Sequence, residues 1–375
     1  MTTPHALLRV GLSYKKTLGM RRLTNTPSDL TIGADNKLYV LCRGGQAVTF
    51  LRTLSTDDDD LLAFNFVGKG GGGDGGDFSI EGKYIWPAAL AYHPDGNIFM
   101  SDEGTHQITE MTTSGKLVAQ WGEQGTAPGF LNRPSGIAFD SQNNLLVVNA
   151  MNHRIDRFTT AGKHLETIGS FGDGEGQLNM PWGITVSPDD DIYVSDWQNK
   201  RIQMFNKNGS FVKQIGGPGD SDGCFDQPTG LAVDANGDLF VADKSTSKVQ
   251  LFNSEGQFVQ KITGDATLGK QAIEFLYSNP VALRIREMTP LEPQKDLRGP
   301  TSVKTDGEGN VYITDYASHR IQVYHNEVIP LTKEQIAEPL LLSLGKQAAM
   351  SLFSSSINEN GFLIVLTAGI SPIPF

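Results

Sequence analysis

The sequence lacks most of the features that place a protein in a membrane or in an oxidising compartment. It has only 2 cysteines in 375 residues, Cys42 and Cys224, and they lie in distant parts of the chain, so we expect no disulfide between them. No apolar run reaches the roughly 20 residues that a membrane span needs. Residues 1–9 show no basic segment followed by an apolar core, which a secretory signal would have. We therefore expect a cytoplasmic protein without a membrane span.

Positive charge is also scarce. Lysine and arginine number 31 against 42 acidic residues, which gives a net charge of −11. Proteins that bind nucleic acid usually present a basic face. The composition therefore disfavours nucleic acid as a partner and places RNA binding third among the functions considered below.

A six-residue phrase recurs at a fixed interval, and we call it the inner-strand motif. Clear copies read PAALAY, PSGIAF, PWGITV and PTGLAV and begin at residues 87, 134, 181 and 228, which are 47 residues apart each time. Weaker copies begin at Pro27 (PSDLTI) and Pro300 (PTSVKT). A period of this length with several strands per repeat is typical of propellers or solenoids. Six copies predict six blades.

Each repeat predicts four short strands. In the fifth copy, apolar or alternating segments at 230–234, 238–243, 248–252 and 257–262 are separated by turns rich in glycine, asparagine and aspartate. This pattern is typical of a half-buried antiparallel sheet. The last repeat has no clear fourth strand, and we predict that residues 7–13 supply it from the N-terminus, so that the ring closes without an unpaired edge. The propeller should span residues 5–326.

A second recurring segment carries a family resemblance. DWQNKRI at 196–202 recurs as NAMNHRI at 149–155 and DYASHRI at 315–321, with looser copies at 102–108 and 243–249. Together with the inner-strand motif, this segment resembles the NHL repeat. The resemblance implies an all-β, six-bladed propeller over about 300 residues. It does not imply one activity, because propellers of this family serve as RNA-binding domains, docking platforms, sensors and lyases.

Three histidines at one repeat offset form a candidate metal site. His106, His153 and His319 each come four residues after the Asp or Asn that ends the second strand. Three imidazoles on one face could hold zinc, whereas the alternative is that this offset simply tolerates histidine. The resemblance to amidating lyases implies zinc-binding histidines directly after the proline of the motif. No histidine stands there in this sequence, so the resemblance does not support that mechanism.

The strand-ending acids have two interpretations. Asp102, Asp196, Asp243 and Asp315 could form a ring of carboxylates for calcium. The alternative, which we favour, is that each one accepts backbone N–H bonds in the turn that follows it and pairs with an arginine five residues on, such as Arg201 or Arg320. No cofactor is predicted outright; zinc and calcium are the two metals to test.

The loops between second and third strands should share one face with the connections between blades. Loops on a rigid scaffold commonly carry function, so we expect the ligand on this face. Aromatic side chains there could stack a ligand. The candidate ligand-binding residues are Trp182, Trp197, Tyr316, Asn149, Asn152, Arg154, Arg201 and Arg320. Packing at the rim is the alternative role for the three aromatics.

The connections between blades are acidic. They carry Asp173, Glu175, Asp220, Asp222 and Asp226, which favours a cationic partner. The interval from Pro228 to Pro300 is 72 residues, 25 more than the period, and the inserted connection at 265–299 contains a short helical pattern. It could lie over the binding face as a lid or docking element, or pack against the rim. Residues 327–375 predict a C-terminal helical and apolar extension.

The function that these observations favour is a binding scaffold. Its partner would be a protein, a peptide or a small molecule held by the loop face around the central channel. The alternative is a metal-dependent lyase or hydrolase at the channel mouth. The sequence identifies neither the ligand nor the oligomeric state.

Overall fold

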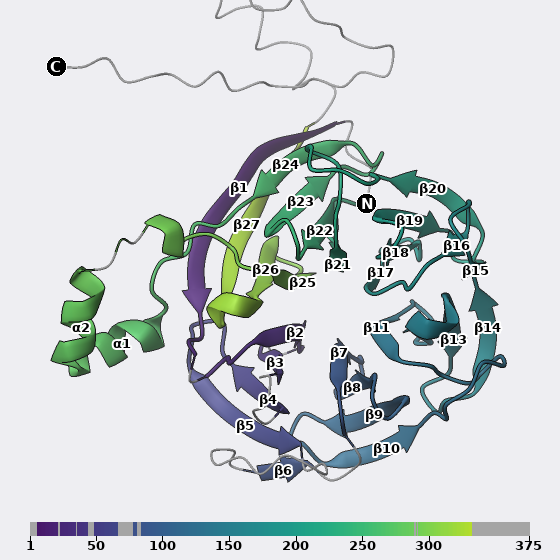
Figure 1. Cartoon of the computed structure of the whole chain (residues 1–375), viewed down its shortest axis with the longest axis horizontal. Coiled ribbons are helices and arrows are strands. Elements are labelled where there is room, and N and C mark those ends of the chain that lie inside the picture. Colours follow the sequence, from purple (N-terminus) through teal and green to yellow (C-terminus); the bar gives the residue numbers. More distant parts are fainter. Residues whose placement is uncertain are drawn as a thin grey trace, which may run out of the picture. The chain divides into compact units, whose positions relative to one another are not determined.

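The computed structural model describes residues 6–331 except 22, 35, 44–48, 67–77, 81–83, 289 and 291. The chain divides into two compact units, Ser13–His325 and a smaller one formed by Met1–Leu12 with Asn326–Phe375. In the larger unit, six sheets are arranged around a ring (Figure 1), as the repeats predict. The helical and apolar extension predicted for 327–375 lies outside the described residues, apart from the end of a strand that reaches Leu331.

The first three blades follow the predicted order, with the inner-strand motif as the innermost strand of each sheet. Blade 1 has a fifth strand, β6, which pairs parallel to β5. Blade 1 comprises β2 (Pro27–Ile32), β3 (Leu38–Arg43), β4 (Thr49–Leu54), β5 (Asp60–Phe66) and β6 (Phe78–Ile80). Blade 2 comprises β7 (Pro87–Tyr92), β8 (Asn97–Asp102), β9 (Gln107–Thr112) and β10 (Leu117–Trp121). Blade 3 comprises β11 (Pro134–Phe139), β12 (Leu145–Asn149), β13 (Arg154–Phe158) and β14 (His164–Ile168).

The next two blades repeat the arrangement. A short parallel pair, β15 (Ser170–Phe171) and β16 (Gln177–Leu178), lies in the connection between blades 3 and 4. Blade 4 comprises β17 (Ile184–Val186), β18 (Ile192–Asp196), β19 (Arg201–Phe205) and β20 (Phe211–Ile215). Blade 5 comprises β21 (Pro228–Val233), β22 (Leu239–Asp243), β23 (Lys248–Phe252) and β24 (Phe258–Ile262).

Blade 6 closes the ring with both ends of the propeller sequence. Its strands are β25 (Pro300–Thr305), β26 (Asn310–Asp315) and β27 (Arg320–Leu331), and β1 (Ala6–Leu18) pairs with β27 as the outermost strand. The predicted closure by the N-terminal strand is confirmed, and the strand is longer than residues 7–13. With β1 in place, blade 6 has four strands like blades 2 to 5, and residues from the two ends of the propeller sequence are held in one sheet.

The core lies between neighbouring blades. The second strands β12, β18, β22 and β26 are buried throughout, whereas the outer strands β14, β20 and β24 alternate between half-buried and exposed residues up to a buried last residue. This difference follows from position, because a middle strand is covered on both faces by adjacent blades and an outer strand faces solvent on one side. Apolar clusters join blade 3 to blade 4 and blade 4 to blade 5.

The inner strands approach one another so closely that glycine is required at the third position of the motif in three blades. A Cβ added to Gly136 would lie 2.7 Å from the carbonyl oxygen of Trp182, and one added to Gly183 would lie 2.0 Å from that of Thr229. A Cβ on Gly230 would lie 2.5 Å from the Cα of Ser302. Glycine at the third position of the motif therefore reflects crowding at the propeller axis.

The long connection forms a helical arm. Helix α1 (Lys270–Ser278) and helix α2 (Pro280–Glu287) lie outside the ring of blades rather than over its centre (Figure 1). The arm is attached at the β4–β5 turn of blade 1, where Asp58 accepts a bond from the backbone N–H of Gln271 and Lys270 pairs with Asp59. The helices do not cover the centre of the ring, and neither of them has a buried residue. A docking role for this insertion stays a prediction.

No helix among the described residues is long and apolar enough to cross a lipid bilayer.

Candidate functional site

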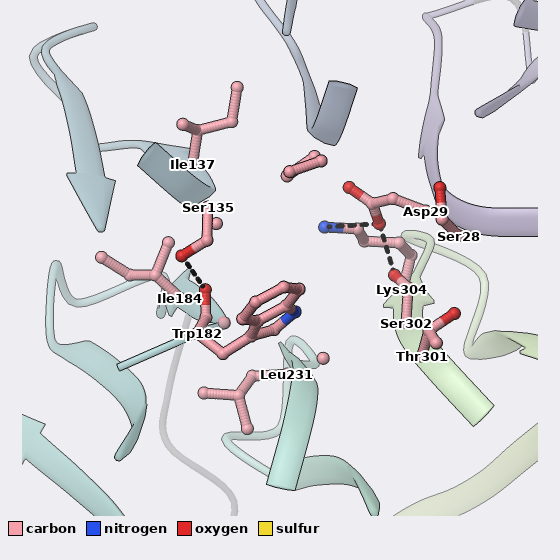
Figure 2. A pocket seen from close by; sticks show the side chains of 15 residues that line it. Ser28, Asp29, Ser135, Ile137, Trp182, Ile184, Leu231, Thr301, Ser302 and Lys304 are labelled. Carbon is pink, nitrogen blue, oxygen red and sulfur yellow. Dashed lines mark hydrogen bonds and ion pairs between the residues drawn. The ribbon is translucent and has the colours of Figure 1, made fainter. Parts of the chain in front are cut away.

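A cavity lies where the inner strands of all six blades begin (Figure 2). It encloses about 400 Å³, counting the solvent space at its mouth. We call this opening the channel mouth. Every blade contributes to the lining, through Ser28, Ala88, Ser135, Trp182, Gly230 and Thr301. Because each second strand ends where each inner strand begins, the mouth lies on the face that carries the loops between second and third strands.

Three side chains in this cavity depart from the repeat. Across all six copies, positions two to five of the inner-strand motif hold only small, hydroxyl or aliphatic residues, with three exceptions. These are Asp29 at position three of blade 1, Trp182 at position two of blade 4 and Lys304 at position five of blade 6. They come from three blades and three offsets, and all of them line the one cavity.

Asp29 joins three blades. One carboxylate oxygen accepts the backbone N–H of Leu90 in blade 2 at 2.7 Å, and the other accepts the hydroxyl of Ser302 in blade 6 at 2.5 Å. The side chain is only 7% exposed. Aspartate thus spans the gap between inner strands where the other blades have glycine, alanine or serine, and both of its oxygens are already engaged.

Lys304 is less constrained. Its ammonium lies 3.8 Å from the nearer oxygen of Asp29, and its side chain is 26% exposed. This separation exceeds the 2.7–3.2 Å of an ordinary N–H···O hydrogen bond. The ammonium therefore faces the cavity with donors that Asp29 does not fully use (Figure 2).

The indole of Trp182 extends into the cavity opposite the Asp29–Ser302–Lys304 group (Figure 2). Its ring centroid lies 6.4 Å from that of Trp197, and both side chains are half-buried. In other blades the residue at the position of Trp182 links strands: Ser135 donates to the Trp182 carbonyl, and Thr301 donates to the Pro27 carbonyl. At this position Trp182 has a flat apolar side chain in place of a hydroxyl. Trp182 and Trp197, both predicted as ligand-binding residues, therefore lie close together.

A second aromatic group lies on the rim between blades 1 and 3. The guanidinium groups of Arg43 and Arg133 lie 5.3 Å and 5.9 Å from the ring centroid of Trp86, which is 49% exposed. Both arginines pair with Glu103, whose side chain is 1% exposed. Cations over an indole face are attracted by its quadrupole, so the glutamate and the indole hold the two guanidinium groups in place.

Tyr316 lies elsewhere on the rim, away from the two tryptophans. The ammonium of Lys244 lies 5.3 Å from its ring centroid, and its hydroxyl donates to the carbonyl of Arg43 at 3.5 Å. The predicted aromatic residues therefore do not form one cluster.

The predicted polar residues of the ligand face are engaged in holding the connections between blades. Asn149 is buried and donates to Asp156, and Asn152 donates to the carbonyl of Gly125. Arg154 donates to the carbonyls of Thr126 and Ala127. Arg201 donates in the same way to Gly174 and Gln177, and Arg320 to Asp296. These bonds tie each 2–3 loop to the connection that precedes its blade, which is a structural role.

The strand-ending acids behave as the favoured alternative predicts. Asp196 and Asp315 pair with Arg201 and Arg320 at 2.8 Å and 2.7 Å. The backbone donors come mainly from the segment before the inner strand rather than from the following turn: Asp243, for example, accepts the N–H groups of Asp226 and Gln227. All four aspartates are fully buried. Among the described residues, no three His, Cys, Asp or Glu side chains come together in a group that could hold a metal.

The three histidines do not converge, and each one links its blade to the next. The Nδ1 atoms of His106, His153 and His319 accept the backbone N–H groups of Arg133, Met180 and Thr26, each at 3.0 Å. Each donor residue directly precedes the proline of the next inner-strand motif. The backbone of all three histidines is in the left-handed conformation, with φ of 60°, 55° and 57°. In blade 5 the hydroxyl of Ser247 accepts the N–H of Gly299 in the same way. Zinc binding by these histidines stays an untested prediction that the contacts do not favour.

These contacts predict a pH-dependent stability. Burial lowers the pKa of all three histidines below the ordinary 6.5, and a neutral Nδ1 is needed to accept a backbone N–H. As the pH falls, these histidines therefore take up protons in the unfolded chain before they do so in the folded one. The stabilisation that they contribute is complete above pH 6.5 and is lost as the pH falls through the pKa values of the folded state. Urea unfolding at pH 8 and pH 5 should show lower stability at pH 5.

Asparagine gives the matched variant, because it tolerates left-handed backbone and offers an oxygen acceptor that does not titrate. The triple His106→Asn, His153→Asn, His319→Asn variant should be less pH-dependent than the wild type. The single His153→Ala variant should lose about 2 kcal/mol, since alanine has no acceptor and is strained at positive φ. An unchanged pH profile in the triple variant would show that these imidazoles are not the titrating groups.

The sequence analysis did not identify Asp29, Lys304, Arg43, Trp86, Glu103, Arg133 or Lys244 as site residues. A signal was present, because these residues occupy repeat offsets: Glu103 and Lys244 share the offset of Trp197 and Tyr316, directly after the strand-ending residue. The acidic connections lie apart from this group, and Asp226 and Asp222 pair with Lys200 and Lys261. A cationic partner for these connections stays a prediction.

Comparison with known families agrees with this architecture. Residues 183–278 match the model of a family described as a 6-bladed beta-propeller, and residues 297–324 match the NHL repeat. The expected six-bladed propeller is confirmed, and the expected likeness to the NHL repeat is found over residues 297–324. No curated protein matches the sequence.

Solved structures share the fold at low identity. A structural genomics protein of unknown function from Bacteroides thetaiotaomicron has a TM-score of 0.58 at 16% identity, over 85% of this chain and 76% of that one. An inactive variant of virginiamycin B lyase from Staphylococcus aureus, crystallised with quinupristin, has a TM-score of 0.52 at 14% identity, over 86% and 89%. The WD40 propeller domain of Doa1 has a TM-score of 0.54 at 14% identity, over 85% and 98%. At these identities the likeness concerns the fold alone.

Proposed function

We propose that this six-bladed propeller with an NHL repeat is a binding protein that takes its ligand at the channel mouth. The ligand would be a small molecule or an exposed end or side chain of a peptide or protein. The observation that carries the proposal is the convergence of Asp29, Trp182 and Lys304 in one cavity. Each is the charged or aromatic exception at its position of the inner-strand motif.

Physical reasons make this convergence informative. Inner strands pack so closely that positions two to five favour small or aliphatic side chains, as the contacts of Gly136, Gly183 and Gly230 show. An indole and an ammonium in this ring do not serve the strand contacts that serine and threonine make in other blades. Departures from a local rule are expected at functional sites, where the gain is in binding rather than in stability.

The surroundings of the mouth suit recognition. Trp182, Trp197 and Trp86 present flat aromatic surfaces that remain partly open to solvent. Partly exposed tryptophan combines a large contact area with few rotatable bonds, and it is enriched where binding energy concentrates. The blades fix these side chains, so little conformational entropy would be lost when a ligand binds.

Ligand-observed NMR with a mixed library of small molecules and short peptides tests the proposal. The informative variant is Trp182→Ser, because serine stands at the same position in blades 1 and 3 and should fold there. We expect the binders of the wild-type protein to weaken at least about tenfold in this variant, the loss of roughly 1.4 kcal/mol or more that an aromatic contact supplies.

Tyr277→Ser is the matched control. Tyr277 is an aromatic residue of the arm that is 77% exposed and lies outside the cavity. Binding should be unchanged in this control. Binders that are equally strong in Trp182→Ser, or a library without any binder that depends on Trp182, would contradict the proposed site.

A further inference from the structure

The charges at the channel mouth are divided between buried acids and accessible cations. Asp29 and Glu103 are buried, and their oxygens are taken by Leu90, Ser302, Arg43 and Arg133. The strand-ending aspartates below the rim are buried as well, with backbone N–H groups or arginines as partners. Of the two charged side chains that line the cavity, Asp29 is buried and Lys304 is partly exposed. Arg43, Arg133 and Lys244 are further exposed cations on the rim, where the partly exposed acid Asp226 is paired with Lys200.

Lys304 differs from the other three cations in its position. Arg43 and Arg133 each make an ion pair with Glu103 at 3.2 Å or less and lie over Trp86, and Lys244 lies over Tyr316. Lys304 alone of the four lines the cavity, 3.8 Å from an acid whose oxygens accept shorter bonds from other donors. An ammonium has three N–H donors, so it can bind an acceptor supplied by a ligand without breaking the bonds of Asp29.

We infer that the cavity binds a carboxylate carried on a flat or apolar body; this rests on the proposed function and names its ligand class. The carboxylate meets the ammonium of Lys304, and the body lies against the indole of Trp182, which faces that ammonium across the cavity (Figure 2). A single cation matches a monoanion. A phosphate dianion would need several convergent donors, of the kind that arginine forks or a glycine-rich loop before a helix provide. The opening of the cavity to solvent lets a ligand insert its charged end while the rest of its body stays at the mouth.

Paired probes that differ only in charge test this inference. Indole-3-acetate and indole-3-acetamide, and benzoate and benzamide, would be titrated into the full-length protein by calorimetry at low ionic strength. We expect each carboxylate to bind at least about tenfold tighter than its amide, because a hydrogen bond to a charged group contributes about 1.5–3 kcal/mol. Uridine 5′-monophosphate, which carries a phosphate and a base, should bind more weakly than indole-3-acetate.

Three variants locate the effect. Lys304→Met keeps the length of the side chain and removes its charge, and it should reduce the preference for the carboxylate to less than about threefold. Lys304→Arg keeps the charge and should retain a preference, which distinguishes lost recognition from a misfolded cavity. Lys261→Met removes a cation of the outer strand β24, which pairs with Asp222 and lies outside the cavity lining, and should leave the preference unchanged.

Several outcomes would overturn the inference. They are equal binding of acid and amide, a preference that survives in Lys304→Met but disappears in Arg133→Met, tighter binding of the nucleotide, or no carboxylate binding at millimolar concentration. The proposed function is tested separately: it fails if the ligands bind the Trp182→Ser variant as tightly as they bind the wild-type protein. If neutral or cationic ligands lose affinity in Trp182→Ser but not in Lys304→Met, the proposed binding site is supported and only the inferred carboxylate is refuted.

Discussion

Replacing Asp196 with alanine should lower the free energy of unfolding by about 3–5 kcal/mol, the usual cost of leaving a buried charge without its partner. The carboxylate is fully buried and accepts the N–H of Asn179 at 2.7 Å and the guanidinium of Arg201 at 2.8 Å. Arg201 is itself 7% exposed and would lose its counter-charge. Chemical denaturation measures the loss, and the melting temperature should fall by an amount on the order of 10 °C.

Blade 3 suggests a rescue variant, because there the buried carboxylate that pairs with the arginine lies on the third strand instead of at the end of the second. There the strand-ending residue is Asn149, and Asp156 accepts bonds from both Asn149 and Arg154. One period later these positions are Asp196, Gln203 and Arg201. The double variant Asp196→Asn, Gln203→Asp should therefore recover most of the stability that Asp196→Asn loses.

Two observations would contradict this account. If the double variant were as unstable as Asp196→Asn alone, the two blades would not be interchangeable. Asp220→Ala serves as the control, since Asp220 is an exposed acid in the connection between blades, and it should change stability by less than about 0.5 kcal/mol. A similar loss in the control would indicate a general charge effect.

Replacing Gly183 with alanine should cost about 3 kcal/mol or more. The new Cβ would lie 2.0 Å from the carbonyl oxygen of Thr229, which belongs to the backbone of the neighbouring inner strand. A backbone atom can move away only if the strand shifts, and overpacking of this kind commonly costs 1–3 kcal/mol and sometimes more. Denaturation of the purified variant measures the effect.

Gly217→Ala is the matched control for Gly183→Ala. The nearest atom to a Cβ at Gly217 is the side-chain amide nitrogen of Gln214 at 3.8 Å, and the residue has no positive φ in the range that favours glycine. Alanine there should be neutral or stabilising by up to about 1 kcal/mol, because it restricts the unfolded chain. Equal losses at both positions would refute the argument from crowding at the axis.

The repeat made the fold predictable. A period of 47 residues, turn residues at fixed offsets and alternating apolar segments specify the strands locally, and six copies specify the ring. The N-terminal strand in blade 6 was predictable as well, because the last repeat lacked the fourth strand that the other repeats have. The face that carries the loops between second and third strands followed from strand order.

The binding site was less predictable, because the position of a residue within the repeat does not show whether its side chain faces a ligand or makes structural contacts. His153 and Arg201 share a face with Trp182, yet their polar atoms are engaged by the backbone of a neighbouring connection. The arm also shows a helical pattern in the sequence, but its attachment through Lys270 to the β4–β5 turn depends on contacts about 200 residues away along the chain.

The sequence by itself determined the number of blades, their strand order, the closure of the ring and the face that carries the loops between second and third strands, because these depend on periodicity and on local turn chemistry. Only the tertiary structure decided that Asp29, Trp182 and Lys304 meet in one cavity, that the three histidines link blades and that the arm lies outside the ring. The physical reason is that closing a ring of six blades brings together residues from blades 1, 4 and 6, and no local pattern records such a meeting.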